Sequence, residues 1–368
     1  MKERERVVGW LVVAIAASLA FTLMPAHGGA DLTLYRRMAR VAIAGGNPYA
    51  DPYADFPPLK MLILTLLERA NLWAVFRSLG FAALVAVTVL FAAAENAGPV
   101  AFLAAVALCF QPLVYQNWIS PFEDKWIYPL LFIPLLRVAR RDTRRGAGAS
   151  GRAASVVLGV LSAYSGVMTL LAPLLMLEIR RRTNSWRRAI ESGLVIAGIV
   201  AASHAAYFPA WLDGYSHRVA RQSLDVPGHE SAFVLVARLG LYARALPNAM
   251  TLAALTAALL VWWRARRLEP ALVLGYFGLL ALGPEASYDR ILAGAFPVYV
   301  LLLRRPLAAA SLILLMLIVA SRGGSPDLTD GGRVALLWAP VVAGLGAWTW
   351  YELESPAGDD RPAPDSIR

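Results

Sequence analysis

The chain has 368 residues, of which 58% are hydrophobic and only 16% charged, and its mean hydropathy is +0.55. A soluble domain cannot hide so much apolar surface, whereas a polytopic membrane protein exposes it to lipid. The formal net charge of +10 lies mainly beside apolar runs, as the positive-inside rule predicts, and no soluble basic domain is present to indicate nucleic-acid binding.

The N-terminal residues predict a first transmembrane helix. Lys2, Arg4 and Arg6 precede an apolar run from Val7 to about residue 24. This charge bias places the N-terminus in the cytoplasm and Asp31, the first charge after the run, outside. Since no small-x-small cleavage site follows, we expect an uncleaved span rather than a signal peptide.

Residues 26–77 are expected to form the first extracytoplasmic loop. Within it, 32–44 predicts an amphipathic helix at the membrane interface, with apolar residues on one face and three arginines on another. Gly45-Gly46 ends this helix. Pro57-Pro58 then opens a short apolar helix, 59–67, which is too short to span and is expected to dip into the outer leaflet.

The middle of the chain contains an apolar stretch that must leave and return to one side of the membrane. Residues 153–179 lie between two arginine clusters, so we expect two short helices with a bend at 162–166. The Gly/Ala/Ser stretch 146–151 before them is typical of a flexible loop. The single cysteine, Cys109, excludes an intramolecular disulfide and a multi-cysteine metal site.

The complete pattern predicts an all-α polytopic membrane protein. Residues 1–351 form one integral domain with about ten transmembrane helices plus short re-entrant or interfacial helices, and both termini are cytoplasmic. Residues 352–368 are acidic and rich in proline, so a disordered cytoplasmic tail is expected.

The predicted topology places three acidic sites outside the membrane, and Asp31 is the first. Its carboxylate suits a general base that activates a hydroxyl at the membrane surface. Aspartate is equally favoured as a helix N-cap, and the two roles are compatible. Because most cytoplasmic loops carry arginine and little else, we expect any chemistry on the outer side.

The other two acidic sites lie in short loops. Glu123 and Asp124 are suited to a divalent cation or a substrate hydroxyl, or they form a solvated turn. Asp289 either lines the same cavity as Asp31 or is neutralised by Arg290. These residues identify no cofactor. A divalent cation, if the protein uses one, is expected at Glu123 and Asp124.

A basic cluster occupies the second long outer loop. Its members are His217, Arg218, Arg221 and Gln222, which neighbour one another on a helix. They suit a phosphate or pyrophosphate at the outer surface, or headgroup contact by an interfacial helix.

The first outer loop carries two short motifs, Gly46-Asn-Pro-Tyr49 and Phe56-Pro-Pro-Leu59, after Asp31-Leu-Thr-Leu-Tyr35. Over about 26–60 this order of features resembles membrane glycosyltransferases of the GT-C superfamily. The strongest resemblance is to the polyprenol-phosphate-mannose-dependent enzymes of glycosyltransferase family 87.

The resemblance implies a mechanism and a set of partners. Asp31 would be the catalytic base, and Tyr35, Asn47 and Tyr49 would contact the substrate. A hexose, mannose by this resemblance, would pass with inversion from a polyprenyl-phosphate donor to a hydroxyl of a glycan or glycolipid acceptor. The basic cluster would stabilise the leaving phosphate.

Two other classes of function fit the same composition. One is a transporter or flippase for a lipid-linked sugar, although charges within the spans are few and no inverted repeat is evident. The other is a non-catalytic membrane component of an envelope complex.

Overall fold

The structure is a computed structural model. It describes residues 30–51, 56–94, 127–140, 147–221, 233–243, 245–265, 268–282, 293–294, 296–298 and 300, and four isolated positions (9, 12, 342 and 346). Within these ranges all regular structure is helical, which confirms the all-α class. The elements in chain order are α2 (Ala30–Ile43), η1 (Pro48–Ala50), α3 (Pro58–Arg69), α4 (Trp73–Ala94), α7 (Ile127–Arg140), α8 (Ala147–Tyr164), η3 (Gly166–Leu171), α9 (Ala172–Thr183), α10 (Trp186–His204), α11 (Phe208–Arg221), α12 (Phe233–Arg238), α13 (Leu246–Ala265) and α14 (Leu268–Ala281).

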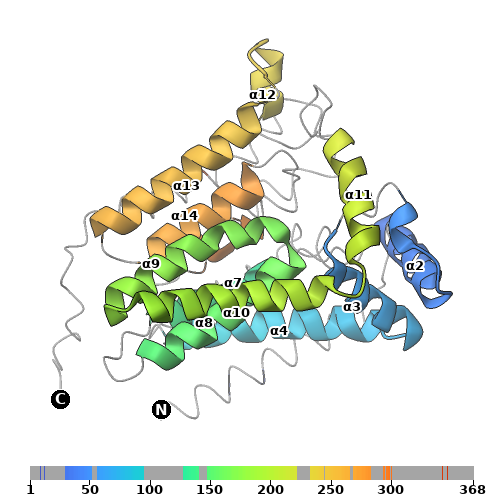
Figure 1. The fold of residues 1–368 in the computed structure, drawn as a ribbon, viewed down its shortest axis with the longest axis horizontal. Helices are drawn as coiled ribbons and strands as arrows, with labels where there is room; N and C mark the ends of the chain where they lie inside the picture. The colour runs from blue at the N-terminus through green and yellow to red at the C-terminus, as the bar shows by residue number, and fades with distance from the viewer. Residues whose placement is uncertain are drawn as a thin grey trace.

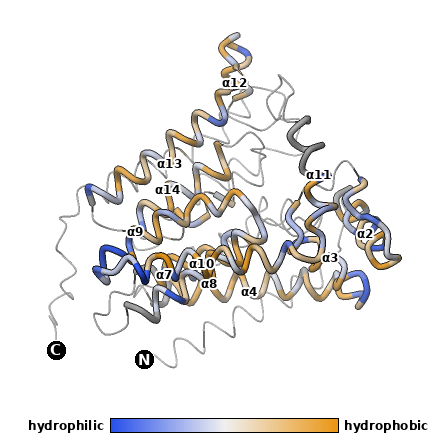
Figure 2. Tube along the Cα trace, viewed as in Figure 1, coloured by the Kyte–Doolittle hydropathy of each residue, from blue (hydrophilic) through white to orange (hydrophobic). Residues whose placement is uncertain are grey.

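Two of the described helices are long and apolar enough to cross a membrane. They are α4, over Trp73–Phe91, and α13, over Leu246–Arg264. The helices α10 and α11 pass the same test together but are bent by 88° at the short break between them. Apolar residues dominate α4, α13 and α14 (Figure 2). These helices are compatible with a membrane protein, while the count of about ten crossings and their direction stay predictions.

The core is built around α14, which is buried along almost its whole length and is apolar on all sides except for Glu269 in its first turn. It packs along α13 and also contacts α7, α9 and η3, while α8 lies along α10 (Figure 1). Small residues bring α13 and α14 close together, because a Cβ added at Gly278 would overlap that of Ala254. Phe132 of α7 stacks on Tyr276 of α14 with ring centroids 3.8 Å apart.

The bend predicted within 153–179 is confirmed. The helix α8 ends at Tyr164, Ser165 is extended, and η3 leads into α9. The prediction of a flexible loop at 146–151 is wrong, because α8 begins at Ala147. Alanine favours helix, and Ser155 in the next turns is fixed against Ser192 of α10, so tertiary packing outweighs the local glycines.

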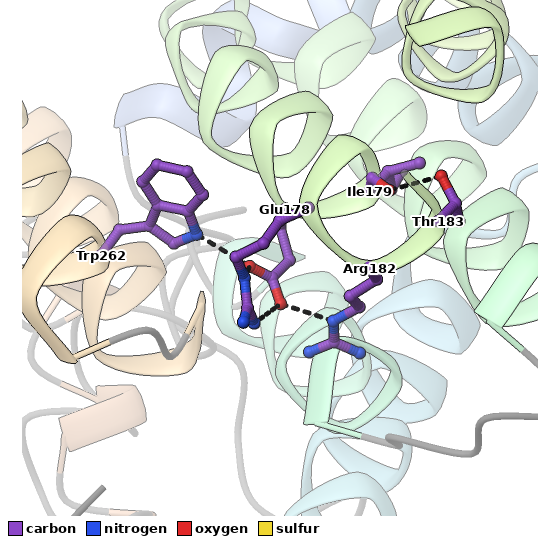
Figure 3. Close-up of polar contacts among 6 residues, drawn as sticks. Glu178, Ile179, Arg182, Thr183 and Trp262 are labelled. Carbon is purple, nitrogen blue, oxygen red and sulfur yellow. Dashed lines mark hydrogen bonds and ion pairs between the residues drawn. The ribbon is translucent and has the colours of Figure 1, made fainter. Parts of the chain in front are cut away.

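A buried carboxylate joins α9 to α13. Glu178 accepts hydrogen bonds from Arg181 and Arg182 on its own helix and from Nε1 of Trp262 at 2.8 Å (Figure 3). A buried charge needs several such partners to offset its lost hydration. The hydrogen bond from Trp262 therefore links α13 to α9.

The two helices of the first loop form where the sequence predicts them, while their positions relative to the membrane stay predictions. The amphipathic helix is α2, which ends where Gly45 takes a positive φ of 79°. The short helix after Pro57 is α3. The apolar face of α2 packs on α3 in a second core cluster that includes Met38, Ala39 and Leu64.

Candidate functional site

The candidate site begins on the first turns of α2. Asp31 is the second residue of this helix, and Tyr35 follows one turn later, so the two positions share a helix face. The Tyr35 side chain is buried against α3. The side chain of Asp31 lies outside the described part of the structure, so its roles as base and as helix cap both stay predictions.

A buried lysine meets Tyr35 from α3. Lys60 is only 8% exposed, and its Nζ donates a 3.0 Å hydrogen bond to the Tyr35 hydroxyl. The same ammonium lies over two aromatic rings, 4.4 Å from the centroid of Tyr35 and 4.7 Å from that of Phe56. Cation–π attraction and the hydrogen bond help to offset the cost of burying this charge. The geometry places a cation beside the α2 face that carries position 31.

The Gly-Asn-Pro-Tyr motif forms the short helix η1. Asn47 caps it, because its Oδ1 accepts a 2.9 Å hydrogen bond from the backbone N–H of Tyr49. The Tyr49 side chain is completely buried and lies between Phe56 and Tyr207, with ring centroids 6.4 Å and 6.0 Å away. Its hydroxyl has no hydrogen-bond partner among the described residues. Burial, reinforced by Tyr207, raises the pKa of Tyr49, so the phenol stays neutral. Substrate contact by Tyr35, Asn47 and Tyr49 stays a prediction.

The first and second loops meet where η1 packs on α11. Tyr207, immediately before α11, and Trp211 in its first turn belong to the core cluster that contains Tyr49. Successive residues of an α-helix are rotated by about 100° about its axis. Positions 218 and 221 of α11 therefore lie on the same side of the helix as 207 and 211, and position 217 lies at the edge of that side. The fold thus joins the first-loop motifs to the helix that carries His217, Arg218 and Arg221. The side chains of these three residues are not described.

The carboxylate of Glu68 links α3 to α2. Glu68 accepts hydrogen bonds from Arg36 at 3.0 Å, Arg40 at 2.6 Å and Nε1 of Trp73 at 2.6 Å. Burial opposes the charge on Glu68, but the hydrogen bonds from Arg40, Arg36 and Trp73 outweigh it and hold the pKa below its ordinary value. Arg37 pairs separately with Asp51.

An apolar cavity of about 580 Å³ opens beside the bend between α10 and α11. Met176, Gly193 and Ile196 are among the residues that line it, and His204 and Trp211 lie at the bend. The two rings meet edge to face with centroids 4.7 Å apart. The volume of the cavity falls in the range of about 300–1,000 Å³ that is typical of ligand pockets, and its apolar lining suits a hydrocarbon chain.

Four candidate residues lie outside the described residues: Gln222, Glu123, Asp124 and Asp289. Within the described ranges, no group of three or more His, Cys, Asp or Glu side chains is arranged to hold a metal ion. A divalent cation at Glu123 and Asp124 is therefore untested and stays a prediction.

Sequence reasoning overlooked the lysine. Lys60 is the one charge between Pro58 and Leu67, on an otherwise apolar helix. An isolated charge on such a helix is a recognisable signal, because it must find a partner when the helix packs. The contact between η1 and α11 has no equivalent signal, because about 160 residues separate the two elements along the chain.

Comparison with protein-family models found no match for this chain, and comparison with curated protein sequences also found none. The resemblance to glycosyltransferase family 87 therefore rests on the sequence, and chiefly on the first-loop motifs.

Proposed function

We propose that the chain is an integral membrane glycosyltransferase. It moves a hexose, mannose by the first-loop resemblance, from a polyprenyl-phosphate donor to a hydroxyl of an extracytoplasmic glycan or glycolipid. Asp31 is the general base, and the arginines of α11 hold the phosphate that leaves.

The proposed reaction is a single inverting displacement. The acceptor hydroxyl loses its proton to the Asp31 carboxylate as its oxygen bonds to the anomeric carbon. The bond from that carbon to the donor phosphate oxygen breaks, and the phosphate takes the electron pair. Arg218 and Arg221 balance the charge that develops there. Phosphate is a good leaving group without protonation, so no second carboxylate is required.

One observation carries the proposal: η1, the Gly-Asn-Pro-Tyr motif, packs on α11. This contact supports one shared site for the base of the first loop and the cations of the second. The neighbouring cavity of about 580 Å³ supports a place for the hydrocarbon part of the donor. Lys60, which donates a hydrogen bond to Tyr35, adds a positive charge beside a residue that lies one helical turn from position 31.

The test measures transfer of radiolabel from polyprenyl-phosphate sugars to an acceptor extract by membranes that contain the full chain. Asp31→Asn keeps the size of the side chain and removes its basicity. We expect kcat/KM to fall by about 100- to 10,000-fold, the usual contribution of a general base. Asp213→Asn is the control, since Asp213 is an exposed acid on another side of α11.

The outcomes separate the functional classes. Transfer that persists in Asp31→Asn rules out Asp31 as the base. Absence of transfer by the wild-type chain with every donor counts against an enzyme. Movement of the lipid-linked sugar between leaflets without a new glycosidic bond indicates the flippase alternative.

A further inference from the structure

The three arginines of α2 are held in place by ion pairs with two carboxylates. Arg36 and Arg40 each use Nε to bind one oxygen of Glu68, at 3.0 Å and 2.6 Å, and Arg37 binds Asp51. Trp73 donates to the same Glu68 carboxylate and so fixes it. Side chains that are already ordered lose less entropy when they bind a ligand.

Charge is layered across this surface. The side chains of Glu68 and Asp51 are only 9% and 17% exposed, whereas those of Arg37 and Arg40 are 63% and 64% exposed and that of Arg36 is 39% exposed. The carboxylates therefore lie beneath, and the guanidinium groups face outward. The surface that a ligand meets is positive.

The arginines also retain donors. Because Arg36 and Arg40 bind Glu68 through Nε, their terminal nitrogens have no hydrogen-bond partner among the described residues. The side chains of Arg36, Arg37 and Arg40 line an open groove of about 670 Å³. The other residues that line it are Thr33, Val41 and Ala44. Planar guanidinium forks match the geometry of phosphate oxygens.

The groove is connected to the start of a candidate membrane span. Trp73 is the first residue of the candidate span in α4, and it donates a hydrogen bond to the same Glu68 carboxylate as Arg36 and Arg40. Tryptophan is enriched at the interface between membrane and water. Val41 in the groove and Ile43 beside it are exposed apolar residues, which an aqueous surface does not favour but a lipid interface does.

We propose that this groove binds the phosphate of an anionic phospholipid headgroup in the leaflet beside α2. The guanidinium groups take the phosphate, and the apolar residues at the C-terminal end of α2 contact the start of the acyl chains. Binding here would fix α2, and with it position 31, relative to the bilayer. The site does not depend on the proposed reaction.

The experiment uses the full chain, purified in a neutral detergent and titrated with single lipids under native mass spectrometry. Phosphatidylglycerol is compared with phosphatidylcholine that has the same chains, and inorganic phosphate is added as a competitor. The test variant is Arg37→Gln/Arg40→Gln, which leaves Arg36 on Glu68. The matched control, Arg187→Gln/Arg188→Gln, removes the same charge from exposed positions on α10.

The wild-type chain is expected to bind phosphatidylglycerol more tightly than phosphatidylcholine. The test variant is expected to lose about thirtyfold in affinity for phosphatidylglycerol, because two contacts between a guanidinium group and the phosphate are lost and each contributes about 1 kcal/mol at an exposed site. The control variant keeps the preference. An Arg37→Lys/Arg40→Lys variant keeps the charge but not the guanidinium fork, so it binds phosphatidylglycerol more tightly than the glutamine variant and less tightly than the wild-type chain, which separates charge loss from misfolding.

Three results overturn the proposal. One is equal binding of both lipids by the wild-type chain. Another is an equal loss in the control variant, which indicates a general charge effect. The third is displacement of the lipid by inorganic phosphate at equal concentration, which indicates a free-phosphate site instead.

Discussion

Replacement of Glu178 by glutamine tests a buried polar contact between two helices. The Glu178 side chain is 2% exposed and accepts hydrogen bonds from Arg181, Arg182 and Trp262 (Figure 3). Glutamine has nearly the same shape but no charge, and one oxygen becomes an NH₂ group. That group is a donor, and it would face guanidinium donors that need an acceptor.

The structure sets the size of the effect. Removing one partner of a buried ion pair costs about 3–5 kcal/mol when the other charge stays buried. Here Arg181 and Arg182 are 35% and 19% exposed, so water can hydrate them again. We therefore expect Glu178→Gln to lower the free energy of unfolding by about 2–3 kcal/mol. Of this, about 1 kcal/mol comes from the hydrogen bond to Trp262.

The assay is denaturant unfolding of the full chain in detergent, followed by tryptophan fluorescence and by circular dichroism. Glu191→Gln is the control, since the Arg187–Glu191 pair is 89% and 56% exposed and should contribute less than about 0.5 kcal/mol. A double-mutant cycle with Trp262→Phe isolates the α9–α13 term. The reasoning is refuted if Glu178→Gln and Glu191→Gln unfold at the same denaturant concentration.

Two further predictions concern the first loop. Tyr49→Phe is expected to stabilise the chain by about 1 kcal/mol, because it removes a buried hydroxyl that has no partner in the described structure. Tyr35→Phe should destabilise the chain by about the same amount, because it removes the hydrogen bond from Lys60. Thermal unfolding of both variants measures the two effects, and a Tyr49→Phe variant less stable than the wild-type chain would contradict the prediction. The lowered pKa of Glu68 means that its stabilising contribution is complete above its ordinary value of 4.5 and is lost as the pH falls below it. Stability measured between about pH 6 and pH 3 should therefore fall less steeply in Glu68→Gln than in the wild-type chain, and parallel curves would argue against this assignment.

Local patterns in the sequence were sufficient for the elements of the first loop. The apolar period predicted α2, Gly45 marked its end, and Pro57-Pro58 marked the start of α3. These features depend on residues within a few positions of one another, so no distant contact is needed to specify them. The apolar runs that became α4 and α13 were evident for the same reason.

Only the tertiary structure decided which of these elements meet. Nothing near Tyr49 in the sequence indicates that its ring packs against Tyr207, or that η1 supports the helix of His217, Arg218 and Arg221. The partner of Glu178 on α13 is 84 residues away, and a glycine-rich stretch became the first turn of α8. Burial against distant residues determines these contacts, because apolar attraction has no direction and only the folded geometry selects the neighbours.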